Sequence, residues 1–261
     1  QPPSHPGLLD WLATRFVADG WKVKDLHRLI MNSDTYRRSS RFATGKHLDE
    51  DPDNRLLWRA NRRRLEAEAL WDAVHATAGT LNRAFGGPPV VPPLAADEIA
   101  SLREKWHWTV SSDPAQHTRR GIYVMVRRNF KFPMFEVFDT PVTSVSCPVR
   151  DVTTVAPQAL WSLNNGSVIR QATQLAGRVV KEAGEKSPAH IQRAWQIVLA
   201  RPPTPKESSS ALALLDSLEK TSQTELEHLP EPLKKLAAPR RRALAKLCLA
   251  LFNLNEFAFV D

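Results

Sequence analysis

Cysteine is scarce in this chain of 261 residues, which has only Cys147 and Cys248. Two cysteines are too few for a fold built on disulfide bridges, and no Cys-x-x-Cys or Cys-x-x-Cys-His spacing occurs. The segment therefore carries neither a zinc ribbon nor a covalently attached haem. One bridge between the two thiols is an alternative in an oxidising compartment. Cys248 lies in an apolar helical pattern, which favours a buried, unbridged side chain.

Long hydrophobic runs and catalytic signatures are missing too. No stretch approaches the length of a membrane-spanning helix. The eight histidines are dispersed, without His-Glu-x-x-His and without ligand spacing typical of zinc, so we expect no metal site. No Gly-x-Ser-x-Gly nucleophile turn occurs either. Together these absences favour a non-catalytic domain.

Positive charge is in excess, with 36 Lys and Arg against 28 Asp and Glu and a net charge of +8. Much of it lies in short arginine clusters at 62–64, 119–120, 127–128 and 240–242. Such clusters favour anionic partners: a polymer, a membrane surface or an acidic protein. A solvated basic face is the simpler interpretation. Because the clusters lack interleaved aromatic residues, we do not expect nucleic acid as a partner.

Helical periodicity dominates the chain, so we predict a mainly α, multi-helical domain. In the second of the predicted helices, Leu26, Leu29 and Ile30 are expected to point inward. Residues 121–126 are β-branched and aromatic, which predicts a minor β element near residues 120–127. The predicted helices span residues 7–19, 23–32, 62–81, 156–163, 167–183, 188–199, 204–219 and 239–255.

Proline and glycine mark the remaining segments. Residues 86–118 contain Gly-Gly-Pro-Pro and Pro-Pro and are predicted to form a long loop excursion. Residues 222–239 are polar and are predicted to form an exposed connector. We expect one domain over residues 1–261. Two helical lobes, 1–85 with 119–165 and 166–261, are the alternative division.

Several phrases of the sequence occur together in a fixed order. They include Leu8-Leu9-Asp10-Trp11-Leu12, Leu26-His27-Arg28-Leu29-Ile30, Asp51-Pro52-Asp53-Asn54, Arg63-Arg64-Leu65-Glu66, Ser146-Cys147-x-x-Arg150, Thr153-Thr154-Val155-Ala156-Pro157-Gln158 and Asn253-x-Asn255-Glu256-Phe257. Together these phrases resemble domain of unknown function 1553, a C-terminal planctomycete domain of proteins that also carry planctomycete-type cytochrome c domains. The resemblance extends from about residue 4 to the end of the chain.

This resemblance implies an exported, extracytoplasmic parent protein, either periplasmic or at the cell surface. Haem c is expected in other domains of that parent and no cofactor in this segment. The expected partners are the cytochrome c-bearing domains of the same polypeptide. The family implies no known reaction. The first residue is Gln1 rather than Met, so we expect the chain to have been cut from a longer one.

The densest polar constellation lies between residues 119 and 165. Arginine forks bind carboxylates, while amides and hydroxyls bind sugars, so such a set suits an anionic or carbohydrate ligand. Two tryptophans of the long loop would add a stacking surface for sugar rings. The candidate ligand-binding residues are Arg119, Arg120, Arg127, Asp139, Arg150, Thr153, Thr154, Gln158, Asn164, Asn165, Trp106 and Trp108.

A structural explanation of the same residues is simpler. Asp139 and Asp151 would pair with the arginines, and Thr153 and Thr154 would cap the helix that begins at Ala156. The leading hypothesis is therefore an interaction or scaffold domain of unestablished function. The alternative is a carbohydrate-binding or carbohydrate-active domain for anionic polysaccharide.

The resemblance makes one prediction about the gene. We expect the coding sequence upstream of Gln1 to encode a secretory signal and a Cys-x-x-Cys-His segment. Long-read sequencing of the parent gene tests this. A short upstream region with neither feature would leave a stand-alone basic helical domain.

Overall fold

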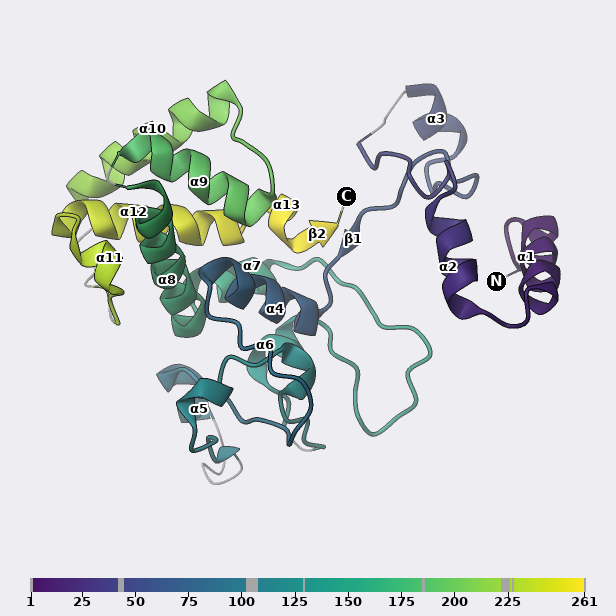
Figure 1. The fold of residues 1–261 in the computed structure, drawn as a ribbon, viewed down its shortest axis with the longest axis horizontal. Coiled ribbons are helices and arrows are strands. Elements are labelled where there is room, and N and C mark those ends of the chain that lie inside the picture. The colour runs from purple at the N-terminus through teal and green to yellow at the C-terminus, as the bar shows by residue number, and fades with distance from the viewer. Residues whose placement is uncertain are drawn as a thin grey trace. The chain divides into compact units, whose positions relative to one another are not determined.

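A computed structural model of the chain describes residues 2–41, 45–101, 108–128, 130–184, 186–221, 226 and 228–260. Helices dominate these residues, which confirms the mainly α class (Figure 1). The sheet found among them has two strands, β1 (Arg63–Arg64) and β2 (Phe259–Val260). The chain divides into a first unit, Gln1–Arg63 with Phe259–Asp261, and a second unit, Arg64–Ala258. This division falls elsewhere than the boundary of the two lobes considered above.

The first unit holds three helices, α1 (Pro6–Ala18), α2 (Val23–Met31) and α3 (Gly45–Glu50). The bounds of α1 and α2 agree with the first two predicted helices, whereas no helix was predicted at α3. No residue of α1 or α2 is buried. Leu29 and Ile30, expected to point inward, are 40% and 36% exposed. The predicted apolar face of α2 exists, but no core of the first unit covers it.

A tightly bonded turn, residues 51–61, follows α3. The Asp51 carboxylate accepts hydrogen bonds from the amides of Arg55 (2.9 Å) and Leu56 (2.7 Å). The side-chain amide of Asn54 donates to the backbone carbonyl of Arg59 at 2.8 Å. These bonds hold Asn54 and Leu57 at φ +54° and +57°. A left-handed leucine costs about 1–2 kcal/mol, so the surrounding bonds must offset this strain.

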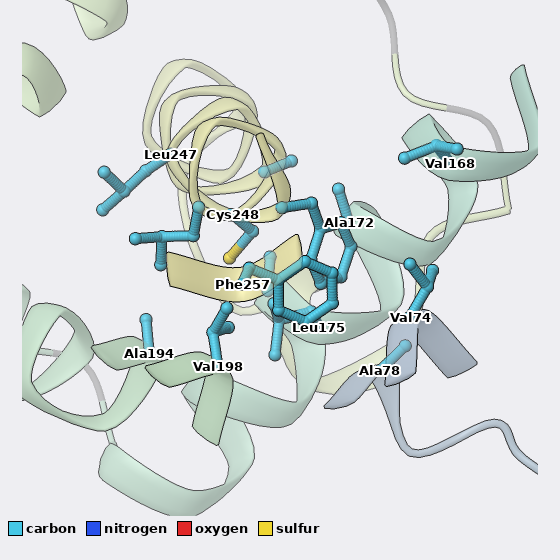
Figure 2. Packing of buried hydrophobic residues seen from close by; sticks show 14 of the residues in the cluster. Val74, Ala78, Val168, Ala172, Leu175, Ala194, Val198, Leu247, Cys248 and Phe257 are labelled. Carbon is cyan, nitrogen blue, oxygen red and sulfur yellow. The ribbon is translucent and has the colours of Figure 1, made fainter. Parts of the chain in front are cut away.

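The second unit is a bundle centred on α8, which packs against α4, α9, α11 and α12. Leu175 and Val179 of α8 are completely buried, and Cys248 of α12 lies in the same cluster (Figure 2). The apolar spacing of 3.6 residues places one stripe of each helix against α8. The main helices of this unit are α4 (Ala67–Ala78), α7 (Ala156–Asn164), α8 (Gly166–Ala183), α9 (Ser187–Leu199), α10 (Pro205–Thr221), α11 (Glu231–Lys234), α12 (Ala238–Phe252) and α13 (Asn255–Ala258).

The prediction of a strand at residues 121–126 is wrong, because Gly121–Tyr123 forms the 3-10 helix η3. The Asp72 carboxylate accepts the Gly121 amide at 2.6 Å, so a side chain takes the hydrogen bond that a strand would need. Only single bridges follow in the described residues, Val90 with Val124 and Arg127 with Phe130. The other short helices are α5 (Ala96–Ser101), η2 (Pro114–Gln116) and α6 (Pro133–Val137).

Two further predictions need correction. The helix predicted over residues 62–81 begins only at Ala67, because the preceding residues 63–64 belong to β1. The connector predicted at residues 222–239 is not fully exposed, since it contains α11. Leu233 is 0% exposed and Leu236 is also buried against the core. The segment carries four leucines at spacings of three and four residues, Leu226, Leu229, Leu233 and Leu236, and the first two also pack against the core. This helical spacing was a signal that the prediction missed.

The two cysteines lie in different environments. Cys147 is exposed and Cys248 is buried, and both are free thiols. Burial raises the pKa of Cys248 well above its ordinary value, so its thiol stays protonated and behaves as a small apolar side chain. The alternative of a bridge between them is therefore wrong for this structure.

An ion triad joins the end of α9 to later parts of the second unit. The Arg201 guanidinium bonds the carboxylates of Glu207 and Glu256, each at 2.7 Å. The hydrogen bond from Arg201, followed by that from the backbone amide of Thr204, holds the pKa of Glu207 well below its ordinary value.

None of the helices in the described part of the chain combines the length and apolar character needed to cross a bilayer.

The close approach of α8 to the segment before α11 makes a prediction. A methyl group added at Gly177 would overlap the ring of Pro230. We expect Gly177→Ala to destabilise the fold by about 1–3 kcal/mol, although alanine favours helix by about 1 kcal/mol. Urea unfolding measures the change. The double variant with Pro230→Ala should recover most of the loss, and an unchanged or stabilised single variant would contradict the packing.

Candidate functional site

The polar residues at the start and end of one long loop converge on Asp139. Its carboxylate bonds the Arg64 guanidinium at 2.6 Å. The same carboxylate accepts the Thr153 amide at 2.8 Å and the Thr153 hydroxyl at 2.9 Å. Asp139 has φ +61°, a conformation that aspartate tolerates better than most residues. The Asp139 side chain thus joins the buried Arg64 to Thr153, which lies 14 positions after Asp139 in the chain.

Arg64 is almost fully buried, with 4% of its side chain exposed. Its Nε and Nη1 have no hydrogen-bond partner among the described residues. The guanidinium also lies 5.3 Å from the centre of the Phe138 ring. A buried cation needs a paired anion, so the position of Asp139 is set by the charge of Arg64.

The pKa of Asp139 is below its ordinary value. Burial by itself raises this pKa, but the amide and hydroxyl of Thr153 and the charge of Arg64 outweigh it. Gln158 also belongs to the polar group around Asp139. Its side-chain amide donates to the Val137 carbonyl at 3.1 Å. Its side-chain oxygen accepts the Val155 amide at 3.4 Å. Gln158 thereby also caps the first turn of α7.

Residues 140–155, the pinned loop, run between α6 and α7 as a long trace (Figure 1). Asp139 and Thr153 tie its two ends together. Arg150, three residues before Thr153, ties the returning part of the loop to α4 through the Glu68 carboxylate at 2.8 Å, which raises the pKa of Arg150 further. Five exposed valines lie along the loop: Val142, Val145, Val149, Val152 and Val155. The loop thus presents apolar side chains and is held at residues 139, 150 and 153.

The candidate arginines serve separate contacts. Arg119 is buried, and its guanidinium donates to the Pro88 carbonyl at 3.1 Å and lies 3.9 Å from the Tyr123 ring centre. Arg120 pairs with Asp72 at 2.8 Å, and the Nε of Arg127 donates to a methionine sulfur. The structural explanation was right that arginines pair with carboxylates, but wrong about which ones.

The remaining candidates also disperse. Asn165 caps α8 by accepting the Ser167 amide at 2.9 Å, and Asn164 donates to a carbonyl one turn earlier. Thr154 is exposed, and Val155 rather than a threonine is the N-cap of α7. Trp108 is buried, and its indole donates to the Pro92 carbonyl at 2.7 Å, so it offers no surface to a sugar ring. Trp106 lies outside the described residues.

Three residues of this region were not among the candidates: Arg64, Glu68 and Asp72. Arg64 and Glu68 stand in the phrase Arg-Arg-Leu-Glu-Ala-Glu, which contributed only to the resemblance. A buried arginine cannot be told from a solvated one by sequence. The helical spacing of Glu68 and Asp72, four residues apart, was the one signal that they share a face.

A second polar spot of the same unit surrounds His75, which is buried against Trp71 with ring centres 4.3 Å apart. Burial lowers the pKa of His75 to about 4, so the ring is neutral at pH 7. Its Nδ1 shares a hydrogen bond with the Thr80 hydroxyl at 2.9 Å. The adjoining cavity of about 20 Å³ has room for one water molecule. This spot is too small for a substrate.

Within the described ranges, no group of three or more His, Cys, Asp or Glu side chains is placed to hold a metal ion. The arrangement around Asp139 holds and orients backbone at both ends of the loop. Fold and site therefore define a helical domain with a pinned, apolar loop.

Comparison with known families assigns the chain to one of them. The model of a family described as "Protein of unknown function (DUF1553)" matches residues 1–215. The chain belongs to this family, which confirms the resemblance found in the sequence. The phrases near residue 253 lie beyond the matched part. The comparisons with curated proteins and with solved structures found no match.

The Asp139 network makes a prediction about stability. Asp139→Asn keeps the left-handed backbone but leaves the buried Arg64 without its anion, so we expect a loss of about 2 kcal/mol at pH 7. Asp151→Asn, an exposed change on the same loop, should cost less than about 0.5 kcal/mol. Urea unfolding of both variants provides the comparison.

The same network sets a pH dependence. Because the folded pKa of Asp139 is lowered, its stabilisation is present above the unfolded pKa of about 4. It is lost as the pH falls through the lower, folded pKa. The difference between wild type and Asp139→Asn should therefore shrink below about pH 4. A difference that does not vary with pH, or an equal cost of Asp151→Asn, would rule out the role of this carboxylate.

Proposed function

We propose that the chain is a non-catalytic interaction module that uses the pinned loop to dock onto cytochrome c-bearing segments of its own polypeptide. The extracytoplasmic location and the haem-bearing partner are taken from the family resemblance alone. The single observation that supports docking is the loop itself, whose valines are exposed on a segment held at Asp139, Arg150 and Thr153. Val145 is 67% and Val149 80% exposed.

The ties of the loop favour such a surface. Ordering a loop on binding costs conformational free energy, and ties that already hold part of the loop reduce this cost. They are Asp139 at the start of the loop and Arg150 and Thr153 towards its end. Burial of each valine in an interface contributes about 1.5 kcal/mol.

The alternative function, carbohydrate recognition, has less support. Its premises were a converging arginine set and two loop tryptophans. Arg120 and Arg150 are each paired with a carboxylate of α4, and Trp108 lies in the core. We therefore develop only the interaction module.

Docking predicts that the haem-loaded cytochrome segment of the parent protein binds the intact 261-residue chain. The double variant Val145→Asp/Val149→Asp should weaken binding about tenfold or more, because it places two charges in the apolar contact. Surface plasmon resonance gives the affinities. Val126→Asp is the matched control, since Val126 is also exposed in the second unit but lies outside the loop.

The folding control and the binding of the wild type and of Val126→Asp distinguish the possible outcomes. Both variants must show the circular dichroism spectrum of the wild type. A wild-type chain that fails to retain the haem-bearing segment would refute the proposed partner. A Val126→Asp chain as weak as the double variant would refute the role of the pinned loop.

A further inference from the structure

Residues 82–90 of the second unit, the aromatic loop, present a single ring to solvent. Phe85 is 98% exposed, more than any other large apolar side chain in the described part of the chain. A singly exposed apolar residue is ordinary in itself. Phe85 differs from such residues because a set of buried contacts holds the loop that carries it.

A buried arginine holds the backbone of the aromatic loop. Arg119 is 2% exposed. Its guanidinium donates to three carbonyls of the loop, those of Ala84 at 3.4 Å, of Gly86, and of Pro88 at 3.1 Å. The Gly86 amide donates to the Tyr123 hydroxyl at 2.8 Å. These backbone groups on either side of Phe85 are therefore satisfied inside the protein.

Further features of the loop reduce its need for water. The Ala84 amide donates to the side-chain oxygen of Asn82 at 2.9 Å. Pro88 and Pro89 have no amide hydrogen to satisfy. A segment that enters lipid must have its backbone polar groups bonded within the protein, because hydrocarbon supplies neither donors nor acceptors. The loop around Phe85 goes far towards meeting this requirement.

The charge around the aromatic loop is positive. Two isolated bridges join the loop to the segment 114–128: Asn82 with Arg119 and Val90 with Val124. Neither the loop nor this segment contains Asp or Glu. Carboxylates of the adjoining elements are engaged, since Asp72 pairs with Arg120 at 2.8 Å and Asp113 accepts the Ala115 amide at 2.9 Å. Arg83, in the loop itself, is exposed.

We propose that the aromatic loop inserts Phe85 into the surface of an anionic lipid bilayer. The ring would enter the boundary between headgroups and acyl chains, and the Arg83 guanidinium would pair with lipid phosphate. A protein partner would gain few hydrogen bonds from a backbone already bonded to Arg119. One ring gives reversible binding, to which the net charge of +8 adds. The aromatic loop shares no residue with the pinned loop, so lipid binding does not depend on the docking proposed above.

Vesicle co-sedimentation tests the proposal on the intact chain. The probes are vesicles of phosphatidylglycerol mixed with phosphatidylcholine, and vesicles of phosphatidylcholine alone. We expect saturable binding to the anionic vesicles, weakened by added salt. Phe85→Ala should lower the partition coefficient about tenfold and Arg83→Gln about fivefold. Phe85→Trp should retain the binding, because tryptophan suits the same boundary.

Leu160→Ala is the matched control, because Leu160 is 57% exposed on α7, outside the aromatic loop. It should change the partition coefficient less than about twofold. All variants must show the circular dichroism spectrum of the wild type, which is expected for changes at exposed side chains.

A basic chain binds anionic vesicles through charge alone, so the effect of Phe85 decides the outcome. Equal partitioning of the wild type and Phe85→Ala, or an equal effect of Leu160→Ala, would overturn the proposal. So would a wild-type chain that leaves the anionic vesicles unbound. Binding to heparin that Phe85→Ala weakens, with no binding to vesicles, would assign the loop to an anionic polymer instead.

Discussion

The buried charge of Arg64 is the constraint on which the loop region of the second unit depends. A guanidinium that is 4% exposed must have an anion within reach. Asp139 supplies it from a left-handed position and uses its remaining lone pairs to hold Thr153. One ion pair therefore fixes where α6 ends, where the pinned loop returns and where α7 begins. The valines of the loop are exposed on a backbone that this pair keeps in place.

The two units handle apolar surface differently. In the second, α8 is covered on several sides, and its core residues are inaccessible to water. In the first, α1 and α2 bury no residue, although their sequences carry apolar faces. A groove of about 930 Å³ beside these two helices is lined by Trp11, Leu29 and Tyr36.

Much of the fold was predictable, since α1, α2, α7, α8, α9, α10 and α12 lie close to the predicted ranges. Local periodicity and proline positions determine such helices, because each hydrogen bond spans one turn. The structure at residues 121–126 could not be predicted in this way, because the Asp72 carboxylate on α4 takes the hydrogen bond of the Gly121 amide. For the site, the sequence correctly placed three candidates in one polar group: Asp139, Thr153 and Gln158. It did not identify Arg64, the buried cation at the centre of that group.

By itself, the sequence determined the mainly helical class, the family and the absence of a disulfide-built fold. These follow from local spacing, ordered phrases and composition. The tertiary structure alone decided which arginine meets which carboxylate. Arg64 and Asp139 are 75 residues apart in the chain, and no local pattern links them. It also decided that Trp108 is buried and that Leu29 is not, because burial depends on which elements pack together rather than on the residue's own helix.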